Sequence, residues 1–168
     1  WLTRRFVKLL WPLLVKLAPD LAEDQQEEIA KTILEAGIDG IILSNTTLDR
    51  PDSLPGDFAA EKGGLSGQPL AAKSTAIIGN FYQLTGGKLP IIGVGGVSTG
   101  SDAYEKIQAG ASLVQLYTSL VFRGPTVANS INQELLALLK KDGFKNISQA
   151  VGTAHKNKNR GSKAADGA

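Results

Sequence analysis

Short runs of apolar, mostly branched residues alternate along the chain with longer stretches whose apolar positions recur every three or four residues. The short runs predict strands, and the longer stretches predict helices. This alternation is typical of βα units built around a parallel sheet, and a chain of 168 residues is long enough for one such domain. We expect strands at 13–19, 40–45, 90–96 and 112–118.

Signals at the ends of the longer stretches support the helices between these strands. The first helix is expected to begin after Pro19, where Asp20 and Glu23 have capping-box spacing, and to end at Gly37. Further helices are predicted at about 69–84, at 101–109 before Gly110, and at about 127–141. The residues expected to form their buried stripes are Ile29, Ile33 and Leu34; Leu70, Ile77, Ile78 and Phe81; and Ile131, Leu135, Leu138 and Leu139.

Both ends of the chain differ from its middle. Residues 1–12 include "WLTRRFVKLLW", which predicts a helical segment stopped by Pro12 that packs on the fold or lies on a membrane surface. Residues 13–155 are expected to form the folded domain, and residues 156–168 lack an apolar face and predict a disordered tail. Since the chain contains no Met, we expect it to be processed or part of something longer.

Composition and charge exclude several classes of function. A net charge of +2 gives no electrostatic basis for binding nucleic acid, so no nucleic-acid partner is expected. The chain has no cysteine and a single histidine, His155, which excludes disulfides, cysteine nucleophiles and a zinc site. We therefore expect no metal, and no apolar run approaches the length of a membrane span.

The stretch "IIGVGGVSTG" at 91–100 raises the question of a phosphate site. Gly93, Gly95 and Ser98 do not complete the dinucleotide fingerprint, and the lysine of a P-loop is missing. The last loops of a (β/α)8 barrel are a better fit, because they bind phosphate through backbone N–H groups and a helix N-terminus. Gly95 and Gly96 would let the main chain approach the anion, with Ser98 or Thr99 capping the helix. The alternative is that the glycines only allow a tight turn.

Other polar residues are expected at the same end of the sheet. Lys16 interrupts an apolar strand and either reaches a ligand or extends to solvent. Residues 44–46 and 117–118 follow the second and fourth strands, and carboxyl ends of strands are where such folds place their sites. Asn45 also begins a glycosylation pattern, which a buried strand end disfavours. The long polar segment after it is expected to be functional, and 63–67 forms either a second anion nest or a flexible loop.

Taken in order, "VKLAPD", "SNTT", "GGLSG", "IIGVGG" and "GASLVQLYT" resemble the carboxyl-terminal half of class 2 dihydroorotate dehydrogenases, which are membrane-associated and reduce quinones. The resemblance covers roughly residues 13–155. It implies an α/β fold of the (β/α)8 TIM-barrel family, here only the last four βα units. It also implies oxidation of dihydroorotate to orotate in pyrimidine biosynthesis, with FMN as cofactor and a quinone as acceptor.

The resemblance assigns roles to eight residues. It implies that Lys16 lies near the N1/O2 edge of the flavin and that Ser44 contacts FMN. Asn45 and Thr46 would bind the pyrimidine substrate. The residues implied at the FMN phosphate are Gly67, Gly96, Tyr117 and Thr118.

The same resemblance implies what the chain lacks. The class 2 family takes its catalytic base, a serine, and its quinone tunnel from the amino-terminal half, and Ser66 is not that base. One hypothesis is therefore a fragment of the enzyme. Another is a non-catalytic half barrel that binds FMN weakly, self-associates or joins a complementary half. A third is a different phosphate-binding barrel, such as a dihydrouridine synthase or an isomerase. The family locations are the mitochondrial inner membrane and the bacterial cytoplasmic membrane.

Overall fold

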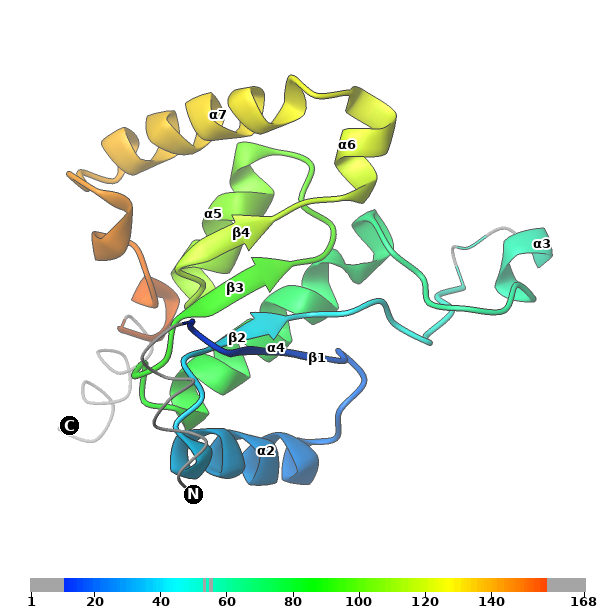
Figure 1. Cartoon of the computed structure of the whole chain (residues 1–168). Coiled ribbons are helices and arrows are strands. Elements are labelled where there is room, and N and C mark those ends of the chain that lie inside the picture. Colours follow the sequence, from blue (N-terminus) through cyan, green and yellow to red (C-terminus); the bar gives the residue numbers. More distant parts are fainter. Residues whose placement is uncertain (1–10, 53, 55, 157–168) are drawn as a thin grey trace, which may run out of the picture.

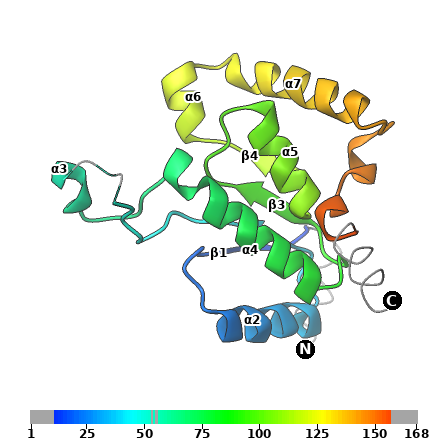
Figure 2. The same ribbon diagram turned by 180° about the vertical axis from the view of Figure 1, so that it is seen from behind.

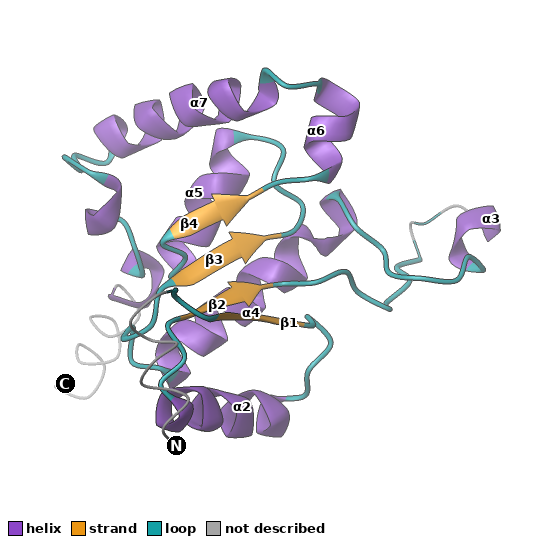
Figure 3. Ribbon diagram, in the orientation of Figure 1, coloured by secondary structure: helices purple, strands orange, loops and turns teal. Residues whose placement is uncertain are grey.

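A sheet of four parallel strands forms the centre of the computed structural model, which describes residues 11–52, 54 and 56–156 (Figures 1 and 3). The strands are, in order along the chain and across the sheet, β1 (Leu14–Leu17), β2 (Gly40–Leu43), β3 (Ile91–Val94) and β4 (Leu113–Gln115). Each neighbouring pair is parallel. The four predicted strands are confirmed, although each is shorter than its apolar run.

Helices cover one face of this sheet (Figure 2). The long helices are α2 (Glu23–Ala36), α4 (Ala71–Leu84), α5 (Gly100–Ala109) and α7 (Val127–Lys141). In this view helices α4 and α5 lie in front of the strands, while α2 packs against α4 and α7 packs against α5. The shorter elements are α3 (Gly56–Ala59), α6 (Thr118–Arg123) and 3-10 turns at Gln68–Leu70 and Ile147–Gln149. The order of elements therefore matches the predicted βα units.

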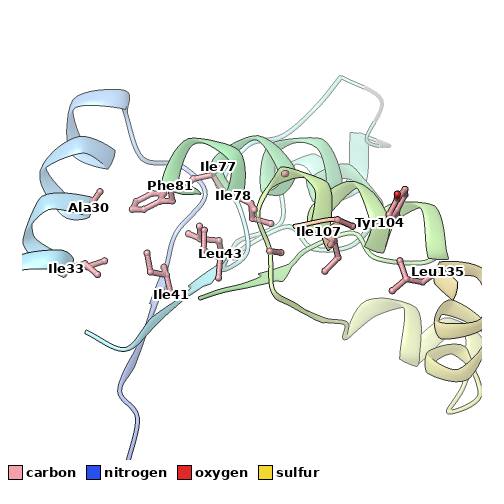
Figure 4. Packing of buried hydrophobic residues seen from close by; sticks show 14 of the residues in the cluster. Ala30, Ile33, Ile41, Leu43, Ile77, Ile78, Phe81, Tyr104, Ile107 and Leu135 are labelled. Carbon is pink, nitrogen blue, oxygen red and sulfur yellow. The ribbon is translucent and has the colours of Figure 1, made fainter. Parts of the chain in front are cut away.

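The core lies between the helices and the covered face of the sheet (Figure 4). Ile41 and Leu43 of β2 and Ile91 of β3 are fully buried there. Ile78 and Phe81 of α4 are also fully buried and belong to the same cluster. Burial of this many aliphatic side chains supplies the main favourable term for folding.

The predicted helical stripes are largely confirmed. All four residues predicted for the stripe of the 69–84 helix are buried, and α7 buries Ile131, Leu135 and Leu139, with Leu138 partly buried beside them. Of the three residues predicted for the stripe of α2, Ile33 is buried and Ile29 is partly buried, and the prediction for Leu34 is wrong because its side chain is 37% exposed. Because α2 lies at the edge of the helical layer, fewer of its apolar positions contact a neighbouring element than the periodicity suggested.

The opposite face of the sheet is open in the described part of the chain. Strand register places Lys16, Ile42, Ile92 and Leu113 in one row across it. Ile42 and Ile92 are only partly buried, and Leu113 is 63% exposed. No described helix covers this row, and β1 and β4 are edge strands (Figure 1). This is the arrangement expected for part of a barrel, in which the same row would face the interior.

Glycines and one threonine set the helix ends as predicted, but Asp20 does not. Gly37 ends α2 with a left-handed φ of 63°, and Gly110 ends α5. Thr99 caps α5, accepting a hydrogen bond from the backbone N–H of Asp102. The capping role predicted for Asp20 is wrong, because its carboxylate accepts hydrogen bonds from Thr47 and Leu48, which follow β2. Ala22 is the residue before α2, and its N–H donates to Oε1 of Gln25 at 3.0 Å.

The predictions for the chain ends are only partly within the described residues. Of the segment 1–12, the structure describes Trp11 and Pro12, which are not helical. Lys156, the first residue of the predicted tail, ends a helical turn that begins at residue 153. Residues 1–10 and 157–168 lie outside the described part of the chain, and the domain bounds stay predictions.

Candidate functional site

The carboxyl ends of the four strands surround a cleft of about 450 Å³. All eight residues assigned to flavin or substrate from the sequence line this cleft. They are Lys16, Ser44, Asn45, Thr46, Gly67, Gly96, Tyr117 and Thr118. Parallel strands bring their carboxyl ends to one edge, which is why positions far apart in sequence meet here. Their individual roles remain predictions.

The turn after β3 presses its main chain against the start of α4. Gly95 and Gly96 have φ values of 127° and 69°, a backbone region that side chains with a Cβ rarely adopt. A Cβ at Gly96 would lie 2.5 Å from Cβ of Ala71, and one at Gly95 would lie 3.0 Å from Cβ of Ser74. Outside the strand ladders, no hydrogen bond from the N–H groups of Gly95 and Gly96 occurs among the described residues. At this turn the cleft is therefore lined by backbone without side chains.

The N-terminus of α5 is arranged differently from the prediction. The Oδ2 atom of Asp102 accepts hydrogen bonds from the N–H groups of Ser98 and Thr99 at 2.9 and 2.8 Å. The carboxylate of Glu134 on α7 accepts from the N–H of Gly100 at 2.5 Å. Two carboxylates thus already occupy the positive end of this helix. An anion in the cleft must rely on the glycine turns more than on the end of α5.

The second glycine loop lies beside the end of β2 and the start of α6. Thr47 and Leu65 form an isolated antiparallel bridge, with backbone hydrogen bonds of 3.1 and 2.7 Å. Gly67 has a φ of 84°, and a Cβ there would meet Cγ2 of Thr118 at 3.1 Å. The hydroxyl oxygens of Ser66 and Thr118 are 3.1 Å apart. The loop at 63–67 is therefore held by contacts with Thr47 and Thr118, and its role as an anion nest stays a prediction.

The polar residues after β2 divide into one buried and two exposed side chains. Ser44 is 2% exposed, its N–H donates to the carbonyl of Val94, and its hydroxyl donates to the carbonyl of Asn45. The N–H of Asn45 donates to the carbonyl of Leu17 at 2.8 Å. The side chains of Asn45 and Thr46 are exposed in the cleft. Fixed backbone and accessible side chains suit these two residues to bind a ligand.

Lys16 and Tyr117 are exposed at opposite edges of the sheet, near β1 and β4 respectively. Lys16 is on β1 and takes part in no ion pair with the described residues. Tyr117 is 76% exposed and follows β4. The prediction that β4 continues to residue 118 is wrong, because the chain leaves the ladder after Gln115 and α6 begins at Thr118. The sequence did not reveal α6, a short helix within a run rich in strand-forming residues.

A charged cluster beside the cleft was also missed. Lys73 on α4 forms ion pairs with Asp20 and with Asp49, the latter at 2.6 Å. Burial alone would raise the pKa of Asp20, but hydrogen bonds from Lys73, Thr47 and the Leu48 backbone hold it below its ordinary value. Burial would likewise lower the pKa of Lys73, and its hydrogen bonds to the two aspartates raise it instead. This cluster joins the segments after β1 and β2 to α4.

Comparison with known proteins gives the family. The sequence model of dihydroorotate dehydrogenase matches residues 3–139. The chain belongs to this family. The resemblance drawn from the five motifs is thereby confirmed.

Named relatives are quinone-dependent enzymes. The dihydroorotate dehydrogenase (quinone) of Xanthobacter autotrophicus is 56% identical over 141 residues, which are 84% of this chain and 40% of that protein. The mitochondrial dihydroorotate dehydrogenase (quinone) of Mus musculus is 56% identical over 144 residues, 86% of this chain and 36% of that protein. The chain therefore spans about two-fifths of the length of these relatives.

Solved structures confirm the fold class. The crystal structure of dihydroorotate dehydrogenase from Eimeria tenella in complex with ferulenol superposes with a TM-score of 0.83 at 47% identity. The match covers 86% of this chain and 38% of that one. The four-stranded sheet with its helices is thus part of a TIM-barrel fold. Within the described residues, no helix has the length and apolar character needed to cross a membrane.

Proposed function

We propose that this chain forms the flavin- and pyrimidine-binding part of a quinone-dependent dihydroorotate dehydrogenase, the enzyme that oxidises dihydroorotate to orotate. One observation carries the proposal: eight residues assigned from separate sequence motifs line a single cleft. The cleft volume of about 450 Å³ lies within the range of small-molecule sites, roughly 300–1,000 Å³. Membership of the family supports the same reaction.

The glycine turns fit the phosphate end of FMN. Gly67, Gly95 and Gly96 all have positive φ, and a Cβ at any of them would crowd a neighbour. Consecutive main-chain groups without side chains form concave anion sites. Thr118, held beside Ser66, and Tyr117 flank this end of the cleft. The residues present therefore fit a phosphate ester.

The remaining residues suit a flavin ring and a pyrimidine. FMN, when bound, would supply the acceptor for the hydride of dihydroorotate. The exposed ammonium of Lys16 would hold negative charge on the reduced ring, with Ser44 contacting the cofactor. Asn45 carries both an amide donor and an acceptor, which match the alternating N–H and C=O groups of orotate. Thr46 adds a hydroxyl.

We assign no catalytic base to this chain. In our proposal, the serine that abstracts the proton and the quinone site belong to the part of the relatives that the chain does not span. Its own residues then bind and orient cofactor and substrate without completing the reaction. The chain alone is therefore expected to show no dihydroorotate turnover with a quinone analogue, and measurable turnover contradicts this assignment.

Orotate binding tests the proposed substrate site without requiring turnover. Orotate added to the FMN-loaded chain is expected to change the flavin absorbance spectrum, because the ligand and the ring share one cleft. Asn45→Ala should abolish the orotate effect while FMN still binds. Asn132→Ala, which changes an exposed asparagine on α7, is the matched control and should behave like wild type. A flavin spectrum unaffected by orotate contradicts the proposal.

A second candidate is a non-catalytic half barrel that pairs with a complementary half or with itself. The open row of Ile42, Ile92 and Leu113 favours it, as do the edge strands β1 and β4. Unpaired strand edges and exposed apolar faces favour association.

We also propose that the parent enzyme is attached to the mitochondrial inner membrane or to the bacterial cytoplasmic membrane.

A further inference from the structure

A buried lysine behind the cleft has no role in the function proposed above. Lys106 on α5 is only 1% exposed. Its Nζ donates to the carbonyl of Ala71 at 3.2 Å, to Oγ of Ser74 at 3.1 Å and to Oγ1 of Thr75 at 3.0 Å. All three acceptors belong to the first turns of α4. The ammonium therefore fastens α5 to the N-terminal end of α4.

The residues held by Lys106 are the ones that touch the glycine turn. Ala71 is the neighbour that a Cβ at Gly96 would strike, and Ser74 is the neighbour of Gly95. The hydroxyl of Ser74, itself fully buried, donates to the carbonyl of Val94 at 2.7 Å. The position of the Gly95–Gly96 turn thus depends on contacts that Lys106 organises.

The charge of Lys106 is not neutralised by an ion pair. None of the salt bridges among the described residues includes it. Two of the charged residues on the helices packed around α5 bind groups other than Lys106. Lys73 on α4 pairs with Asp20 and Asp49. Glu134 on α7 accepts the N–H of Gly100. Burial lowers the pKa of Lys106 to about 8, while the charges of Asp102 and Glu105 oppose that shift. A buried cation held only by neutral oxygens is costly to keep for packing alone.

We propose that Lys106 is a positioning residue for the phosphate end of the cleft, acting through Ala71 and Ser74 on the Gly95–Gly96 turn. The inference rests on the proposed function, in which this end of the cleft binds the phosphate of FMN.

Comparison of FMN with riboflavin, which lacks the phosphate, isolates this role. The affinities of both flavins are measured by fluorescence quenching for wild type, Lys106→Met and Lys31→Met. The last variant removes an exposed lysine of α2 and changes the net charge equally. Lys106→Met is expected to weaken FMN binding about tenfold and riboflavin binding less than about twofold, because only the phosphate end of the cleft changes. Lys31→Met should alter neither.

Ser74→Ala provides a second variant in case Lys106→Met does not fold. It removes the hydroxyl that links Lys106 to Val94 and should also weaken FMN selectively. Retention of the wild-type preference for FMN over riboflavin in a folded variant overturns the inference and leaves the proposed function standing. Equal weakening of both flavins also overturns it, since that reports a general structural role. If the wild type binds neither flavin, the proposed function fails and the inference fails with it.

Discussion

Thr47 donates a 2.5 Å hydrogen bond to the carboxylate of Asp20, joining the segment after β2 to the segment after β1. The other carboxylate oxygen of Asp20 accepts the N–H of Leu48 at 2.8 Å. Asn45 and Thr46 directly precede these residues and are the proposed substrate contacts. The long polar segment therefore starts from a fixed point, and the exposed side chains of Asn45 and Thr46 are held at the cleft.

Loss of the Asp20 carboxylate should loosen this segment. Asp20→Asn removes charge-assisted hydrogen bonds to Lys73 and Thr47, so trypsin should cleave after Lys62 about tenfold faster. The cleavage rate is measured by mass spectrometry on the folded chain. Asp24→Asn, which changes an exposed carboxylate on α2, is the matched control. Equal rates in the two variants would show that Asp20 does not anchor the segment.

Acid should remove the contribution of the Asp20 carboxylate to the free energy of unfolding. The pKa of Asp20 is lower in the folded chain than its ordinary value, so its stabilising effect is present above about pH 4 and is lost as pH falls below that. The difference in unfolding free energy between wild type and Asp20→Asn should therefore shrink between pH 6 and pH 3 in urea titrations. A difference that is constant over this range contradicts the assignment.

Gly96→Ala and Gly143→Ala separate backbone strain from crowding. Both glycines have similar positive φ, 69° and 76°, but a Cβ at Gly96 would strike Ala71, whereas a Cβ at Gly143, after the end of α7, would meet open space. We expect a loss of about 3 kcal/mol for Gly96→Ala and about 1 kcal/mol for Gly143→Ala in urea unfolding. Equal losses would mean that the turn does not press on α4 as described.

Lys106 should make stability rise with pH. Its pKa is about 8 in the folded chain and near its ordinary 10.5 when unfolded, so between these values the unfolded state binds more protons. Unfolding free energy should therefore increase from pH 7.5 to 9.5, on the order of 1–2 kcal/mol. Lys106→Met should show no such rise. The range stops at 9.5 because burial raises the pKa of Tyr104 to about 12, which removes stability above pH 10. A parallel pH dependence of the two proteins contradicts this account.

The open face of the sheet should mediate association of the chain with itself. Leu113 is 63% exposed on the edge strand β4, so Leu113→Lys should reduce concentration-dependent association in sedimentation velocity. Leu136→Lys, which changes a 52% exposed leucine on α7, should leave it unchanged. Equal effects of the two substitutions would place the contact elsewhere.

Much of this fold follows from local pattern. Branched apolar runs marked the strands, and Gly37, Gly110 and Thr99 set helix ends where the sequence placed them. The cleft residues were also predictable, because carboxyl ends of parallel strands meet and because the motif order resembles one family. Agreement is best where a single residue type satisfies a single backbone requirement.

Three features that the sequence did not reveal share a physical cause, which is contact between segments distant in sequence. Asp20 looked like a helix cap but binds Thr47 and Lys73. The N-terminus of α5 looked open to an anion but is occupied by Glu134 from α7. Lys106 sits in a polar helical stretch that is typical of a surface, and only the packing of α5 against α4 buries it.

The most direct test of the account is a titration of the purified chain with FMN, followed by quenching of flavin fluorescence. We expect saturable binding of one FMN per chain, tighter than that of riboflavin, because the glycine turns and Thr118 form the phosphate end of the cleft. No saturable quenching by about 1 mM, or no preference for FMN over riboflavin, would contradict the assignment of this cleft as a flavin phosphate site.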